Sequence, residues 1–152
     1  MLRKTIRTLS SKPSVLVVED EGLVALHLKE CLSDLGLSAD VFTEGKPALE
    51  ALTSTTYAAA VLDLGLPDIS GGEIVKALLD RDPAFRIVLT TGHDVHEVER
   101  RFGSAPRVRV LGKPYDASML EDELARLGIV HAIERPPVRM FDTDFTEALM
   151  IA

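Results

Sequence analysis

Val15-Leu-Val-Val-Glu-Asp-Glu21 decides the fold, because a short apolar run rich in β-branched residues ends there directly in paired acids. A run of this length and composition is typical of a buried strand in a parallel sheet. Open α/β folds place their ligands at the carboxyl ends of such strands. Glu19 and Asp20 offer the hard oxygen ligands that Mg²⁺ prefers, usually with several waters retained. The stretch therefore predicts a parallel sheet with a cation site at its edge.

The composition is that of one folded domain with tails. The chain has 152 residues, 46% hydrophobic and 27% charged, which suffices for one core. A net charge of −7 repels phosphate backbones, so we expect no direct nucleic-acid binding. No apolar run approaches the length of a membrane span, so we expect no membrane insertion. Cys31 is the single cysteine and the N-terminal segment lacks the apolar centre of a secretory signal, which together predict a cytoplasmic protein.

Four more apolar runs follow the first, and segments of helical period separate them. This alternation predicts an α/β fold, a doubly wound five-stranded parallel sheet with helices on both faces. The further strands are expected at 38–42, 58–62, 87–90 and 107–111, and helices at about 23–35, within 47–52, from Ser70 through Leu78, from Asp94 through Phe102, and around Leu120 to Leu127. Ser70 and Asp94 each precede a glutamate by three residues, as in a capping box.

The first expected helix has its own pattern. Apolar residues recur in it at i, i+4, i+7 and i+11, which predicts one buried face. That face would consist of Val24, Leu28, Cys31 and Leu35, with Gly36 ending the helix. At the other end, the acids Glu19 and Asp20 would also complement the helix macrodipole. The acid pair alone therefore fits either a cation site or a helix start.

Polar residues follow four of the five expected strands, at positions that a parallel sheet brings to one edge. They are Glu19, Asp20, Asp63, Thr91 and Lys113. Three carboxylates this close repel one another unless a cation such as Mg²⁺ neutralises them. Metal and lysine could offset charge on a transferring phosphoryl group while a carboxylate attacks phosphorus. Asp63, which follows the central strand, is the expected nucleophile.

In this arrangement the sequence resembles the response-regulator receiver domain of two-component signalling, in a stand-alone form like the chemotaxis regulators. The matching pieces are Glu19-Asp20, Asp63-Leu-Gly-Leu-Pro67 with Gly71, Thr91-Gly92 and Lys113-Pro114. All four pieces occur in order, each at a strand end. The resemblance covers 13–128 and leaves 1–12 as an N-terminal tail and 129–152 as a C-terminal extension. Tails this short predict a receiver with no output domain attached.

The resemblance implies a flavodoxin-like fold with strand order 2-1-3-4-5. It further implies that Asp63 accepts a phosphoryl group from a sensor histidine kinase or a histidine phosphotransfer protein. Mg²⁺ would be held by Asp20, Asp63 and the backbone carbonyl of Gly65, with Glu19 acting through water. Lys113 would pair with the aspartate or its phosphate. Thr91 would bond a phosphoryl oxygen.

Output would then be contact with an unknown downstream protein rather than enzymatic turnover. Homodimerisation is a further candidate, because the extension carries apolar residues that would either fold back or mediate self-association. These are Phe141, Phe145, Leu149 and Met150.

One residue departs from the pattern of the receiver family, and two pairs of residues have more than one possible role. Many receivers carry an aromatic residue three positions before the lysine, where this chain has Val110, so the usual coupling of phosphorylation to output is in question. Gly65 and Gly92 either leave the site open or meet a backbone need at positive φ. Thr90 and Thr91 are adjacent, and since side chains alternate along a strand only one can face the site. The spacing to Lys113 favours Thr91.

Two other functions compete with the phosphoacceptor. One is a receiver-like interaction scaffold that never takes phosphate, against which the complete acidic set argues. The other is an aspartyl-phosphate phosphohydrolase. Those enzymes carry a second catalytic aspartate two residues after the nucleophile, where this chain has Gly65.

Overall fold

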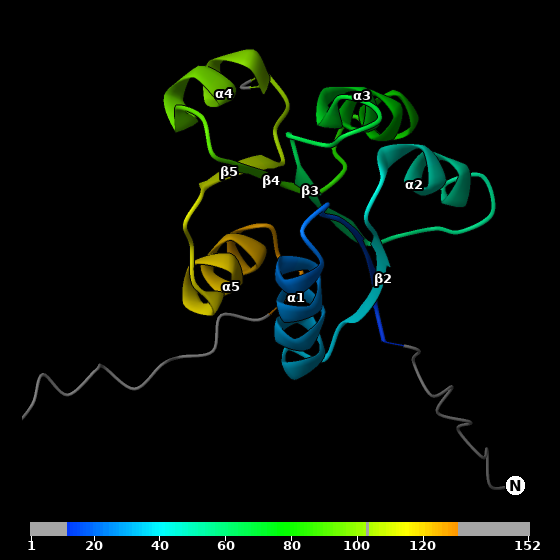
Figure 1. Ribbon diagram of the computed structural model, residues 1–152, viewed down its shortest axis with the longest axis vertical. Helices are drawn as coiled ribbons and strands as arrows, with labels where there is room; N and C mark the ends of the chain where they lie inside the picture. Colours follow the sequence, from blue (N-terminus) through cyan, green and yellow to red (C-terminus); the bar gives the residue numbers. More distant parts are fainter. Residues whose placement is uncertain (1–11, 103, 131–152) are drawn as a thin grey trace, which may run out of the picture.

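The computed structural model describes residues 12–102 and 104–130, in which five parallel strands form one sheet in the order β2-β1-β3-β4-β5. The strands are β1 (Ser14–Val18), β2 (Ser38–Phe42), β3 (Ala59–Asp63), β4 (Ile87–Thr91) and β5 (Val108–Gly112). The helices are α1 (Gly22–Asp34), α2 (Gly45–Ala51), α3 (Gly71–Arg81), α4 (Val95–Phe102) and α5 (Ala117–Arg126). Figure 1 shows α1 and α5 on one face of the sheet and the other three helices on the opposite face. The flavodoxin-like fold and its strand order are confirmed.

The sheet has a core on each face, because successive residues of its central strands point to opposite sides. Val15 and Val17 of β1 pack with residues of α1 and α5. Leu16 and Val18 pack with residues of α2, α3 and α4. All four side chains are completely buried. This burial on both faces explains why the first strand reads as a continuous apolar run rather than an alternating one.

Helices α1 and α5 end in the same way. Gly36 and Gly128 adopt φ of +79° and +73°, the left-handed conformation that glycine adopts without steric cost. The residue after each glycine donates its N–H back into the helix, from Leu37 to the carbonyl of Leu32 at 2.9 Å and from Ile129 to that of Leu124 at 3.1 Å. These bonds form the Schellman arrangement, so the predicted stop at Gly36 is confirmed, and Gly128 ends α5 in the same way.

The predicted buried face of α1 is wrong by a small rotation of the helix. The buried residues are Ala25, Leu28 and Leu32, whereas the other predicted members, Val24, Cys31 and Leu35, are only partly buried. Helix α1 is apolar at most of its positions, so several overlapping faces fit its sequence equally well. The small side chain of Ala25 is buried, whereas the larger Leu23 and Leu26 are exposed.

The N-cap half of each predicted capping box is present. The Ser70 hydroxyl accepts the N–H of Gly72 at 3.2 Å, and the Asp94 carboxylate accepts the N–H of His96 at 2.8 Å. Both bonds satisfy N–H groups that lack partners inside the helix. The predicted strand limits shift slightly at the functional edge, so that Asp63 and Thr91 are the last residues of β3 and β4.

Two sets of predictions concern the ends of the chain. Ile129 and Val130 pack against the core on the α1 and α5 side, just past the predicted limit of the receiver segment. The proposed role of Phe141, Phe145, Leu149 and Met150 lies outside the described residues, as does the tail before residue 12. Among the described helices none has the length and apolar character needed to cross a membrane.

Candidate functional site

The carboxyl ends of β1, β3 and β5 bring three charged side chains into direct contact. The Lys113 ammonium lies 3.1 Å from Asp63 Oδ2 and 3.2 Å from Glu19 Oε2. Lys113 is held in place by its own N–H, which donates to the carbonyl of Thr91 at 2.7 Å. The ends of three parallel strands thus bring together residues that are far apart in the sequence, as expected.

Glu19 is a buried acid with two hydrogen-bonding partners. Its side chain is almost completely buried. Its carboxylate accepts a hydrogen bond from the Glu21 N–H at 3.2 Å and another from the Lys113 ammonium. Burial raises the pKa of Glu19 well above its usual value, and the nearby Asp63 adds to this rise. The Glu21 N–H and Lys113 act in the opposite direction. A carboxylate with so high a pKa would gain from a further cation nearby.

Asp63 is the more strongly ionised acid of the pair. Burial acts to raise its pKa, but the N–H of Gly65 and the Lys113 ammonium outweigh that effect, so its pKa lies below the usual value. The Gly65 bond is 3.0 Å long and goes to Oδ1, whereas Lys113 contacts Oδ2. Lys113 itself would lose basicity through burial, but Asp63 and Glu19 raise its pKa. Asp63 therefore stays a carboxylate, the form that a nucleophile requires.

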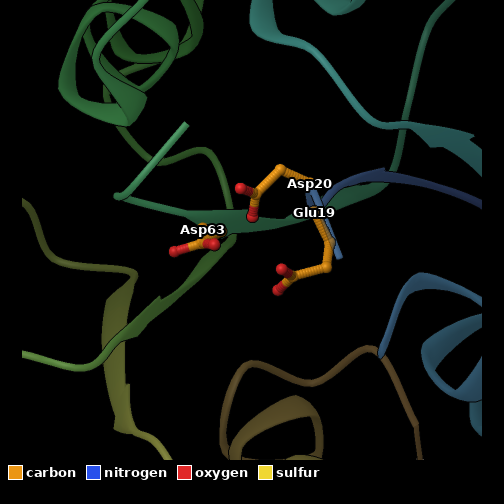
Figure 2. Close-up of side chains that lie close together, drawn as sticks. All are labelled: Glu19, Asp20 and Asp63. Carbon is orange, nitrogen blue, oxygen red and sulfur yellow. The ribbon is translucent and has the colours of Figure 1, made fainter. Parts of the chain in front are cut away.

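Asp20 completes a group of three acids that suits a divalent cation. Oxygens of Glu19, Asp20 and Asp63 lie within 4.8 Å of one another, and Figure 2 shows the three carboxylates together at the strand ends. Asp20 is exposed, so one side of the group is open to solvent. Such a set fits Mg²⁺, which takes few protein oxygens and keeps several waters. The chemistry of the donors therefore agrees with the expected cation.

The two adjacent threonines of β4 differ in what their hydroxyls contact. Thr90 is the register partner of Asp63, and its hydroxyl donates within the sheet to the carbonyl of Leu62 at 3.4 Å. Thr91 is the last residue of the strand, and its hydroxyl accepts the N–H of His93 at 2.9 Å. Both side chains are buried. The choice of Thr91 as the residue that meets a phosphoryl group stays a prediction.

The glycines of the site serve different purposes. Gly65 and Gly92 do not have positive φ, so the backbone explanation does not apply to them. A Cβ at Gly65 would meet nothing closer than Asp63 Oδ1 at 3.7 Å, and one at Gly92 would meet nothing within 4 Å. By contrast, a Cβ at Gly71 would lie 2.5 Å from the Asp63 carbonyl oxygen. Gly71 therefore lets α3 begin directly against the end of β3.

Val110 lies partly buried on β5 beside a small hollow. The hollow has a volume of about 150 Å³ and is lined by Glu99, Phe102, Val108, Arg109 and Val110. Val110, which stands where many receivers have an aromatic residue, therefore lies next to a hollow that its side chain does not fill.

Asp20→Asn distinguishes the two explanations of the acid pair. If Asp20 belongs to a cation site, it repels the neighbouring acids when no metal is bound, so the variant should have a free energy of unfolding about 0.5 kcal/mol higher without metal. It should also lose most of the extra stability that Mg²⁺ gives wild type. If Asp20 chiefly complements the α1 macrodipole, the variant should be less stable without metal. Urea unfolding with and without Mg²⁺ decides between them, and an unchanged Mg²⁺ effect would contradict a metal site.

Comparison with known proteins identifies the family. The model of the response regulator receiver domain family matches residues 15–125, and the chain belongs to this family. The transcriptional regulatory protein QseB of Escherichia coli O157:H7 is 35% identical over 83 residues, which make up 55% of this chain and 38% of QseB. The photosynthetic apparatus regulatory protein RegA of Rhodobacter capsulatus is 27% identical over 144 residues, or 95% of this chain and 77% of RegA. Membership implies a phosphoacceptor role in two-component signalling.

Solved structures agree with this assignment. A sensor protein from Polaromonas sp. JS666 matches with a TM-score of 0.65 and 33% identity, covering 76% of this chain and 94% of that chain. The chemotaxis response regulator CheY4 of Vibrio cholerae has a TM-score of 0.69 at 22% identity, with 76% and 98% covered, and supports the fold. This chain spans only 36–40% of the first curated relatives, so their regulatory activities are properties of those longer proteins.

Proposed function

We propose that this protein takes a phosphoryl group onto Asp63 from a phosphohistidine, on a sensor kinase or a phosphotransfer protein, and signals by contact with another protein. The main support for the proposal is that Asp63 is ionised although it is buried. Its carboxylate is held ionised at the end of β3 by the Gly65 N–H and Lys113, and it lies beside two further acids. A lone buried carboxylate would instead take up a proton.

The chemistry follows from the position of these groups. One oxygen of Asp63 attacks phosphorus while the bond from phosphorus to the imidazole nitrogen breaks, and the histidine, which carries a proton on its other ring nitrogen, takes the electron pair of that bond and leaves as neutral imidazole. Lys113 offsets negative charge on the phosphoryl oxygens. The Thr91 hydroxyl turns from the His93 N–H toward a phosphoryl oxygen. Asp20, Asp63 and the carbonyl of Gly65 would hold Mg²⁺, with Glu19 acting through water, and the bound ion would supply further neutralising charge.

The surface beside the site suits a donor protein with an apolar docking surface. Helices α1 and α5 lie side by side on one face (Figure 1), and they carry the large hydrophobic side chains that are exposed in the described residues. Leu23 is 84% exposed and Leu26 54% exposed on α1, with Met119 on α5. A hollow of about 560 Å³ between α1 and the segment after β5 includes Lys113 in its lining. A donor that covers this apolar surface would bring its phosphohistidine next to Lys113 and Asp63.

Phosphorylation by a small donor tests the proposal without a cognate kinase. We expect wild type incubated with acetyl phosphate and Mg²⁺ to gain the mass of one phosphoryl group, and to gain none when EDTA removes the metal. The readout is intact mass. A wild type that takes no phosphoryl group at any Mg²⁺ concentration would contradict the proposal and favour the interaction scaffold. Turnover of a small phosphorylated substrate would instead favour a phosphohydrolase.

A further inference from the structure

We propose that Asp68 is a positioning residue for the cation site, because it ties the loop that carries Gly65 to the start of α2. The proposal rests on the proposed function, in which the Gly65 carbonyl is a ligand of Mg²⁺. Asp68 itself is no ligand in it. Its role is to hold the connection between β3 and α3 in one conformation.

Two short hydrogen bonds make this tie. Asp68 Oδ1 accepts the N–H of Gly45 at 2.8 Å, and Oδ2 accepts the N–H of Lys46 at 2.7 Å. Both N–H groups belong to the first turn of α2 and have no carbonyl partner within that helix. Hydrogen bonds from the backbone, the one from Lys46 foremost, hold the pKa of Asp68 below its usual value. The carboxylate thus joins segments more than twenty residues apart as a charged cap.

Packing reinforces the tie on both sides of Asp68. Ile69 lies directly over Gly45, where an added Cβ would come within 2.4 Å of Ile69 Cγ1. Pro67 restricts the backbone on the other side, because its ring fixes φ. Further along, Gly71 abuts the end of β3. The connection is therefore held at Asp68 and again at the start of α3.

Gly65 is anchored on its β3 side, where the Leu64 N–H donates to the Thr90 carbonyl at 3.1 Å, so the Asp68 bonds act on the other side of it. It is exposed, it has no side chain, and its N–H bond goes to Asp63 two residues away. Without the Asp68 bonds, the chain that follows Gly65 would be freer, its carbonyl would sample more directions, and metal binding would have to order that part of the loop. Mutating a group that orients a metal ligand typically lowers the affinity for the metal by one to two orders of magnitude. The expected effect is on the affinity for Mg²⁺ rather than on the rate once the metal is bound.

The test compares Asp68→Ala and Asp68→Asn with wild type. Mg²⁺ is titrated with the amide NMR signal of Gly65 as the readout, and phosphorylation by acetyl phosphate is measured across Mg²⁺ concentrations. We expect Asp68→Ala to weaken Mg²⁺ binding about tenfold, with the same maximal phosphorylation rate at saturating metal. Asp68→Asn keeps one acceptor oxygen, so its affinity for Mg²⁺ should lie between those of wild type and Asp68→Ala. A loss caused by charge alone would affect both variants equally.

Asp82→Ala is the matched control. Asp82 accepts the N–H of Ala84 at 2.9 Å in the connection before β4, at the opposite end of the sheet. Its removal costs a similar local bond and should leave Mg²⁺ affinity unchanged. Equal Mg²⁺ affinity in wild type and both Asp68 variants would overturn the role of Asp68 and leave the proposed function intact. Absence of Mg²⁺-dependent phosphorylation in wild type would overturn the proposed function itself. If Asp68→Ala does not fold, Asp68→Asn decides.

Discussion

Asp63→Asn is expected to take no phosphoryl group from acetyl phosphate under conditions that modify wild type completely. An amide oxygen carries no negative charge and does not form an acyl phosphate, so the loss should be total. The variant should still fold, because asparagine has nearly the same size. Its side-chain oxygen can accept the Gly65 N–H that Asp63 accepts at 3.0 Å.

Intact mass measures the Asp63→Asn effect, and Asp82→Asn serves as its control. Asp82 also accepts a backbone N–H, but it lies at the far end of the sheet. The control should be phosphorylated like wild type. Equal modification of Asp63→Asn and wild type would show that another group is the acceptor.

Gly71→Ala should lower the free energy of unfolding by about 2 kcal/mol. The new Cβ would lie 2.5 Å from the Asp63 carbonyl oxygen and 2.8 Å from the Leu64 Cα. Both contacts are with backbone, which cannot turn aside as a flexible side chain can. Helix α3 would have to move away from β3 and would displace Asp63 from Lys113. We therefore expect slower phosphorylation as well as lower stability, measured by urea unfolding and intact mass.

Gly65→Ala provides the matched control for the Gly71 prediction. Gly65 lies in the same connection, but its added Cβ would meet nothing closer than 3.7 Å. Its effect on stability should stay within about 0.5 kcal/mol. A Gly71→Ala variant as stable as Gly65→Ala would contradict the close approach of α3 to β3.

The parallel sheet could be predicted because its central strands are buried on both faces. That burial makes Val15–Val18 a continuous apolar run, and Gly36 marked the end of α1. The orientation of α1 could not be predicted from its pattern. Its sequence offers several apolar faces, of which the structure buries the one with Ala25, Leu28 and Leu32. Tertiary packing therefore determines which face of α1 is buried, whereas the periodicity of its sequence allowed several.

The site was predictable to the extent that strand ends share one edge. Glu19, Asp63 and Lys113 converge for that reason. The direct contact between Glu19 and Lys113 was not foreseen, because it depends on side-chain conformations after two separate strands. The Asp68 bond to α2 was missed as well. An aspartate in a loop after a proline is an ordinary turn residue in sequence, and its partner lies in another element.

The position of the phosphoryl group on the wild-type chain tests the central claim most directly. Borohydride reduces an acyl phosphate to the alcohol, so a phosphorylated aspartate is converted to homoserine. After treatment with acetyl phosphate and Mg²⁺, we predict homoserine at Asp63 in the peptide that contains it, and at no other aspartate. Homoserine at Asp20 or elsewhere, with Asp63 unchanged, would contradict the assignment of Asp63 as the phosphoacceptor.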